Sequence, residues 1–428
     1  MRVTLVRHSK GKTVIAVNTG DESANWKPVD LSERYTILDL LRGIALFGVL
    51  LVNLLYFFRL SLFDHILNFH SHAGWANHAV DLLVTEFVEF KAFDLFSLTF
   101  GIGVAVQAER AGRRGVGVEA FLVRRFLILF GFGVCHMLLV SNVDILCLYA
   151  ACGLLVIPML RLPAAVLAVG GLAAIYLPSV FSGWPSLPPE SVLPAHVADA
   201  TRIYGHGSFG AILEFRWRET QALIVPLLAG VAQKTFGLML LGAAVWRGGV
   251  VRDPRRYRPL LWAVCAAGAV IGLVNTTANL LSESLKMPVN VPPVLQMLGS
   301  HLPLAFAYAA GLLAWRRSKR ADELTSPVAA AGRMALTNYL MQSLVFALLF
   351  YGYGFQLFGR LDPKTAAALG TAFYALQIWF SVRWLGRYRF GPFEWLWRSL
   401  TYGRRQPMRR AADSSRALPA GQFPIQRT

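Results

Sequence analysis

Apolar runs of about 20 residues recur along the 428-residue chain, separated by shorter polar stretches. A helix of about 20 apolar residues crosses a hydrocarbon layer roughly 30 Å thick. We therefore predict an all-α integral membrane protein, a polytopic bundle of about ten transmembrane helices. The predicted spans lie at about 36–58, 80–108, 121–140, 144–160, 162–181, 226–246, 259–281, 293–315, 333–352 and 365–385.

The polar stretches divide the chain into five segments. An N-terminal tail (1–35) precedes a first five-helix half (36–181), which is expected to carry the site. A long outer connection (182–225) ends in the stretch AILEFRWRETQALIVP, which is typical of an amphipathic interfacial helix or of a plain connector. A second five-helix half (226–385) and a basic, partly disordered tail (386–428) follow.

Connections rich in Lys and Arg alternate along the chain with connections that are poor in them. The N-terminal tail, the connections near 110–125, 246–258 and 316–320, and the tail after Arg387 are basic, whereas the connections between them hold almost no Lys or Arg. Basic connections stay on the cytoplasmic side of a membrane. The pattern predicts that both termini are cytoplasmic, in the inner membrane of a bacterium.

Composition supports the membrane assignment. The chain is 55% hydrophobic and only 15% charged, whereas soluble domains are about one quarter charged. The net charge of +18 lies in short stretches between apolar runs, where lipid head groups explain it, so we expect no nucleic-acid partner. The four cysteines lie in apolar runs without a CxxC pair, and the sequence predicts no metal site.

The first predicted span carries an acid, a base and an amide in the stretch LDLLRGIALFGVLLVN. Asp39 and Arg42 lie one turn apart and can pair. Arg42 and Asn53 are eleven residues apart, so their directions around the helix axis differ by only about 20° and they share one face. Arg42 either reaches lipid head groups with Asp39 as its partner or belongs to an internal polar site. Gly43 and Gly48 leave room for a neighbouring helix.

The second span is also charged. Lys91 and Asp94 are three residues apart, so they can pair on one helix face, and Glu86 and Glu89 are spaced in the same way. A charge near the bilayer centre costs roughly 2.5–3.5 kcal/mol, so these side chains should face protein or a water-filled cavity. With the first span, they predict a polar path through the bilayer.

Histidines near the outer side are candidates for general-base chemistry. His136 ends one predicted span and Asp144 begins the next, eight residues on, so the two can meet. The carboxylate would then fix the imidazole tautomer and raise its basicity. A structural hydrogen bond that joins two helices explains the pair equally well. His72 belongs to a His-rich outer connection that lacks an HExxH motif.

Five motifs in order resemble the YeiB-like family of bacterial membrane proteins. They are LDLLRGIALFGVLLVN, FKAFDLFSLTFGIGVAVQAERA, GVCHMLLVSNVDILCLYAACGLL, GRMALTNYLMQS and FGPFEWLWRSLTYG, and they run from about residue 37 to 403. The chain departs from the family pattern at Val143, where Gly is usual, and at Thr99, where Leu is usual.

The YeiB-like family is similar, more remotely, to transmembrane acyltransferases such as heparan-alpha-glucosaminide N-acetyltransferase. Those enzymes carry an acetyl group from cytosolic acetyl-CoA across the membrane to a sugar amine. An Arg-Gly pair and an Asn of their first helix match Arg42, Gly43 and Asn53. A following His-Ala-x-Trp stretch, whose His is catalytic in those enzymes, matches His72 and Trp75.

The expected function is therefore transfer of an acyl group, acetyl by the resemblance, from cytosolic acyl-CoA to a hydroxyl or amine on an outer acceptor such as a glycan. His136 with Asp144, or alternatively His72, would act as the base. The expected acyl-CoA-binding residues are Asp39, Arg42, Asn53 and Lys91. A homodimer is an open alternative to a monomer. The rival function is a transporter or permease whose intramembrane charges relay ions or protons.

Overall fold

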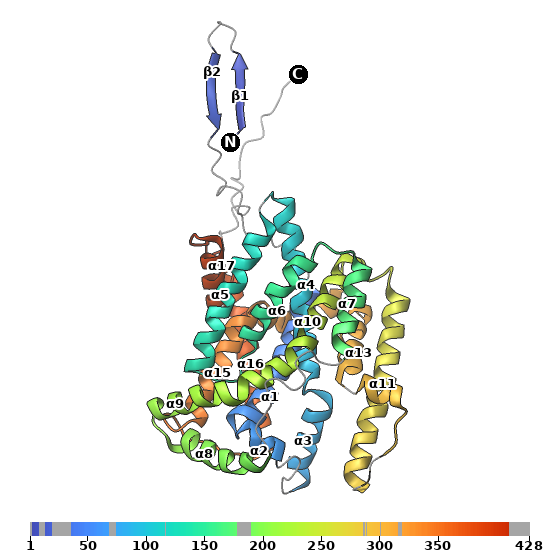
Figure 1. The fold of residues 1–428 in the computed structure, drawn as a ribbon, viewed down its shortest axis with the longest axis vertical. Helices are drawn as coiled ribbons and strands as arrows, with labels where there is room; N and C mark the ends of the chain where they lie inside the picture. Colours follow the sequence, from blue (N-terminus) through green and yellow to red (C-terminus); the bar gives the residue numbers. More distant parts are fainter. Residues whose placement is uncertain are drawn as a thin grey trace, which may run out of the picture.

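The computed structural model describes residues 2–7, 13–18, 36–67, 74–115, 117–177, 190–285, 287, 289–299, 301–315 and 319–410. These residues form a bundle of helices (Figure 1) and one antiparallel hairpin, which the span prediction did not include. The hairpin pairs β1 (Arg2–Arg7) with β2 (Thr13–Asn18). The prediction of an all-α architecture is confirmed for the bundle itself.

The helices follow one another in two groups along the chain. The first group is α1 (Thr36–Asn53), η3 (Leu54–Phe58), α2 (Leu62–Leu67), α3 (Trp75–Phe87), α4 (Lys91–Arg113), α5 (Val118–Leu139), α6 (Ile145–Met159) and α7 (Ala164–Tyr176). The second group is η4 (Glu190–Val192), α8 (Leu193–His206), α9 (Phe209–Glu219), η5 (Thr220–Ile224), α10 (Val225–Arg247), α11 (Arg258–Leu285), α12 (Pro293–Leu298), α13 (His301–Trp315), α14 (Lys319–Arg333), α15 (Ala335–Phe350), α16 (Pro363–Arg387) and α17 (Pro392–Tyr402).

Within the described ranges, five helices are long and apolar enough to cross a membrane, and a sixth span exists if α14 and α15, bent by 69°, count as one. The chain is thus a membrane protein, and a lipid bilayer is its environment. The five are Thr36–Phe58, Val118–Leu139, Phe209–Arg247, Arg258–Ser282 and Pro363–Arg387. Three further predicted spans contain shorter apolar helices, α6, α7 and α13, so the count of about ten stays a prediction.

The second predicted span, 80–108, is not one continuous helix. It breaks between α3 and α4, where Phe90 adopts a positive φ of 57°. This conformation is unfavourable for a side chain with a Cβ, and it has no sequence signature at a phenylalanine. The break redirects the chain just before Lys91 and Asp94, so both charges lie in the first turn of α4. The predicted span 293–315 is likewise divided, into α12 and α13.

Close helix packing places α1 at the centre of the bundle. A Cβ on Gly43 would clash with the Val328 carbonyl of α14, and a Cβ on Gly48 would lie 2.5 Å from the Cβ of Ala92 on α4. Gly332 faces the Asp39 carbonyl in the same way. The predicted role of Gly43 and Gly48 is therefore confirmed, because each lets a neighbouring helix approach closely.

The stretch 211–226 is helical and runs into the following span. α9, η5 and α10 form one helix of 39 residues, Phe209–Arg247, which is longer than a bilayer requires. With α8, its first part lies at the end of the bundle opposite α17 (Figure 1). The fold therefore separates two ends, one built around α17 and the other covered by α8 and α9.

Candidate functional site

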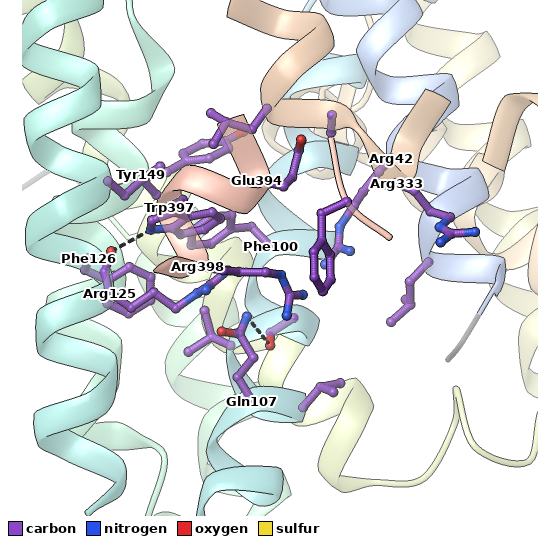
Figure 2. Close-up of a pocket in the computed structure, with 18 of the residues that line it drawn as sticks. Arg42, Phe100, Gln107, Arg125, Phe126, Tyr149, Arg333, Glu394, Trp397 and Arg398 are labelled. Carbon is purple, nitrogen blue, oxygen red and sulfur yellow. Dashed lines mark hydrogen bonds between the residues drawn. The ribbon is translucent and has the colours of Figure 1, made fainter. Parts of the chain in front are cut away.

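A cavity of about 260 Å³ lies between α1, α4, α5, α6, α14, α15 and α17 (Figure 2). Its charged lining is dominated by six arginines, which are Arg42, Arg110, Arg114, Arg125, Arg333 and Arg398. Two carboxylic acids, Asp39 and Glu394, also line it. The cavity is therefore strongly cationic and suited to an anionic ligand.

Arg42 is held between two helices. Its Nη1 lies 3.6 Å from Asp39 Oδ1, one turn earlier on α1, and its Nη2 donates to the Thr99 carbonyl oxygen on α4 at 3.4 Å. The space for the guanidinium exists because residue 103 is glycine, where a Cβ would lie 2.6 Å from Arg42 Nη2. The predicted Asp39–Arg42 pair is thus formed, and it lines the cavity.

Arg125 is a buried cation on the cavity wall. Its guanidinium carbon lies 3.5 Å from the centre of the Trp397 ring, and the Trp397 indole donates to the Arg125 carbonyl oxygen at 2.9 Å. Its Nε is buried and has no hydrogen-bond partner within the described chain. Arg398 follows Trp397 on α17, and its guanidinium carbon lies 4.6 Å from the centre of the Phe390 ring. Figure 2 shows Arg42, Arg125 and Arg398 around the same space.

Thr337 holds the Glu394 carboxyl group at the wall of the cavity. Its oxygens accept hydrogen bonds from the backbone N–H of Thr337, at 3.0 Å, and from the Thr337 hydroxyl, at 2.5 Å. This joins the first turn of α17 to the first turn of α15. Burial raises the pKa of Glu394 above its ordinary value, which favours the neutral acid.

The predicted acid–histidine pair is present in the structure. His136 Nδ1 lies 2.8 Å from Asp144 Oδ2, and both side chains are buried. The other Asp144 oxygen accepts from the backbone N–H of Cys147 at 2.8 Å and caps α6. When His136 Nδ1 donates this hydrogen bond to the Asp144 oxygen, Nε2 keeps its lone pair. His136 Nε2 is buried without a hydrogen-bond partner in the part of the chain that the structure describes.

A glycine brings the two residues together. A Cβ on Gly133, one turn before His136, would lie 2.6 Å from Cys147 N and 2.8 Å from Asp144 Oδ1. The end of α5 can therefore approach the start of α6 more closely than a larger residue would allow. The local sequence GFGVCHMLLVSNVD thus supplies the histidine, the aspartate, the turn between them and the glycine that allows their close contact.

Two tyrosines line the cavity, and one of them connects it to this pair. Tyr339 lines the cavity, donates to Asp144 Oδ2 at 3.5 Å, and has its ring centre 5.1 Å from that of His136. Tyr149 also lines the cavity, and its hydroxyl lies 2.9 Å from that of Ser97. The cavity therefore has a cationic part near α17 and an aromatic part that adjoins His136.

The predicted Lys91–Asp94 pair is not formed. The Lys91 ammonium donates to the Thr85 carbonyl oxygen at 3.0 Å and caps the end of α3. Asp94 instead binds Lys234 of α10 at 2.9 Å and His301 of α13 at 3.1 Å. Both residues lie in the first turn of α4, but each side chain is bound to a group outside α4.

Two further predicted site residues do not line the cavity. Asn53 is half-buried at the end of α1 and does not line it, and Lys91 does not line it either. His72 lies outside the described residues. Sequence reasoning missed Arg125, Arg398, Trp397 and Tyr339. The stretch GPFEWLWRSL, which is one of the family motifs, is the sequence signal for α17. No group of three metal-binding side chains occurs in the described ranges.

Comparison with known proteins gives one family and several bacterial relatives. A family model described as "Protein of unknown function (DUF418)" matches residues 245–404. The chain is 31% identical over 401 residues to "Uncharacterized protein YxaH" of Bacillus subtilis, covering 89% of this chain and 98% of the relative. It is 30% identical over 401 residues to "Uncharacterized protein YeiB" of Escherichia coli, covering 86% of this chain and 96% of that relative. No solved structure matches the chain significantly.

Proposed function

The chain belongs to the YeiB-like family of DUF418 proteins, and we propose that it transfers an acyl group from a CoA thioester to an acceptor at the opposite end of the bundle. One observation carries this proposal. A cationic cavity is also lined by Tyr339, which contacts a buried His–Asp pair whose imidazole Nε2 has no hydrogen-bond partner in the described chain.

The cationic part of the cavity fits the polar end of acyl-CoA, which carries phosphate groups. Arginine binds phosphate oxygens through two parallel N–H groups, so Arg42 and Arg398 are suited to this role. Arg125 is buried with an unpaired Nε, so a bound anion would stabilise it. The uncharged arm and acyl group would then extend along Phe96, Phe100 and Tyr149 towards Tyr339.

His136 would act as the general base. Its Nδ1–H is fixed on Asp144, so Nε2 can accept the proton of the acceptor hydroxyl or amine. The acceptor oxygen or nitrogen forms a bond to the thioester carbonyl carbon, and the carbon–sulfur bond breaks. The proton on Nε2 passes to the departing CoA thiolate, so the protein is unchanged after one transfer.

In this proposal the end of the bundle at α17 faces the cytoplasm of a bacterium, and α8 and α9 face outward. The basic tail that follows α17 supports that orientation in the inner membrane. The acceptor is a hydroxyl or amine of a glycan or another envelope component.

Binding of acetyl-CoA to the purified full-length protein in detergent tests the proposal. We expect acetyl-CoA to raise the midpoint of thermal unfolding, and Arg398→Gln to weaken binding by at least tenfold. Arg383→Gln is the matched control, because Arg383 stacks on the exposed Trp379 of α16 and does not line the cavity. If acetyl-CoA leaves the midpoint of the wild-type protein unchanged, the proposal is wrong.

A second candidate function has its own observation. Asp94 is fully buried between Lys234 and His301, which is an arrangement used for proton relays in transporters. Under this alternative, vesicles containing the protein would accumulate a substrate when a proton gradient is imposed, and Asp94→Asn would abolish the accumulation. An Asp94→Asn protein with unchanged uptake would exclude the relay.

A further inference from the structure

A fully buried arginine lies at the end of the bundle that α8 and α9 cover. Arg216 of α9 has no exposed surface, and it is the largest completely buried side chain in the described part of the protein. Its Nη1 donates to the Leu138 carbonyl oxygen at 3.1 Å. Leu138 is two residues beyond His136 on α5, so this guanidinium is attached to the helix end that carries the candidate base.

One edge of the Arg216 guanidinium is unused. Nε and Nη2 are both buried, and neither has a hydrogen-bond partner among the residues that the structure describes. These two nitrogens share the edge that binds a carboxylate or a phosphate through two parallel N–H groups. A buried cation without a counter-ion is costly, and such a residue is a candidate for binding a ligand of opposite charge.

The nearest acid in the sequence does not serve as that counter-ion. Glu219 follows Arg216 by one turn, but its oxygens are bound by His196 at 2.8 Å, by Tyr204 at 2.6 Å and by the Asn142 amide. No ion pair joins Arg216 to any carboxylate in the described ranges. The charge of Glu219 is thus satisfied, whereas that of Arg216 is not.

Tyrosines complete the surroundings of Arg216. The Tyr351 ring centre lies 5.5 Å from the guanidinium carbon, and the hydroxyls of Tyr204, Tyr351 and Tyr353 interact with it electrostatically. The hydroxyls of Tyr351 and Tyr353 can donate to an anion oxygen that the guanidinium leaves free, whereas the Tyr204 hydroxyl already donates to Glu219. One guanidinium edge and neighbouring hydroxyl groups are together suited to a carboxylate or a phosphate.

We infer that Arg216 binds the acceptor of the transfer reaction through an oxyanion, so that the acceptor carries a carboxylate or a phosphate close to its reacting hydroxyl or amine. This inference rests on the proposed function, because it assigns the second substrate of the same reaction. The anion would hold the acceptor beside the end of α5, within reach of His136. Because Arg216 is completely buried, α8 and α9 must separate from α5 to admit it.

Three probes that differ in one group test the inference on the purified full-length protein in detergent. They are glycerol, glycerate and glycerol 1-phosphate, so the last two distinguish a carboxylate from a phosphate. The Arg42→Gln/Arg398→Gln variant serves as the background, since it lacks two cations of the inner cavity. In this background we expect one of the charged probes to bind at least tenfold more tightly than glycerol, measured by isothermal titration calorimetry.

Adding Arg216→Gln should remove that preference, whereas adding Arg218→Gln should not. Arg218 lies on the same helix, but its side chain is 66% exposed and pairs with Glu214 at 3.5 Å. If Arg216→Gln does not fold, Arg216→Lys keeps the charge and loses the paired N–H edge, and we expect at least fivefold weaker binding. Equal affinity for all three probes, or an equal loss in the Arg218→Gln variant, would overturn the inference.

The outcome is separable from that of the proposed function. If acetyl-CoA does not bind the wild-type protein while glycerol 1-phosphate binds through Arg216, CoA-dependent transfer is wrong and the anion site stands. If acetyl-CoA binds and no charged probe depends on Arg216, the acceptor site is wrong and CoA binding stands.

Discussion

The Arg125 guanidinium lies flat against Trp397, with its central carbon 3.5 Å from the ring centre, and the same indole donates a hydrogen bond to the Arg125 carbonyl oxygen. Two interactions therefore join the second turn of α5 to the middle of α17. Together they hold a buried cation on the wall of the cavity and fix the helix that forms part of this wall.

Trp397→Ala should destabilise the protein and weaken acetyl-CoA binding together. Loss of a large aromatic side chain costs about 3–5 kcal/mol when it is well packed, and here a cation–π contact and a hydrogen bond are lost as well. Thermal unfolding in detergent and a binding titration measure the two effects. Trp397→Phe keeps the ring contact and should retain most of the stability, so equal effects of the two variants would contradict the role of the ring.

Gly103→Ala should weaken acetyl-CoA binding without unfolding the protein. The added Cβ would lie 2.6 Å from Arg42 Nη2, the end of a flexible side chain, which can move away at little cost to stability. Arg42 would then leave its position over Thr99 in the cavity. Gly131→Ala on α5 is the control, because its Cβ would meet no atom within 4 Å. Unchanged affinity in Gly103→Ala would show that the position of Arg42 is unimportant.

His136→Gln should reduce acyl transfer by about 10²–10⁴-fold, the usual contribution of a general base. Acetyl-CoA affinity should change little, because His136 does not line the cavity. Mass spectrometry of acylated envelope products, compared with those of a strain that lacks the protein, measures the loss. Full activity of His136→Gln would show that another residue acts as the general base.

Asp144→Asn separates the two roles of the carboxylate. The amide oxygen can still cap α6, but it cannot stabilise a protonated imidazole as a charge does. We expect nearly normal thermal stability and a large loss of transfer rate. A variant that loses stability and activity in proportion would indicate that the His136–Asp144 bond serves only to join α5 to α6.

The pKa of Glu394, raised by burial, makes stability depend on pH in a defined direction. The folded state favours the neutral acid, so this contribution is fully present below the usual pKa of about 4.5 and is lost as pH rises through the raised pKa of the folded state. Glu394→Gln imitates the neutral acid and should flatten the fall in the unfolding midpoint above pH 4.5. If the wild-type and variant midpoints change with pH in parallel, Glu394 does not titrate in this way.

Features that depend on neighbouring positions could be predicted from the sequence. The Asp39–Arg42 pair and the meeting of His136 with Asp144 follow from spacing within one helix or across one turn, because the residues are at most eight positions apart. Gly43 and Gly48 predict that neighbouring helices approach α1 closely, but not that these helices are α14 and α4.

Features that depend on distant segments could not be predicted. Asp94 finds Lys234 and His301, which are 140 and 207 positions away, and a spacing argument could only pair it with Lys91. α17 was likewise hidden in a segment whose composition is typical of a basic tail, although it contributes Glu394, Trp397 and Arg398 to the cavity.

The position of α17 also sets the order in which the site can be made during synthesis. α1, with Arg42, is the first helix of the bundle to leave the ribosome, and α17 is the last. Until α17 has emerged and packed against α5 and α15, the cavity lacks one wall, and the partner of Arg125 is missing. The cavity therefore has its complete lining only after the last helix has been synthesised and has packed against its neighbours.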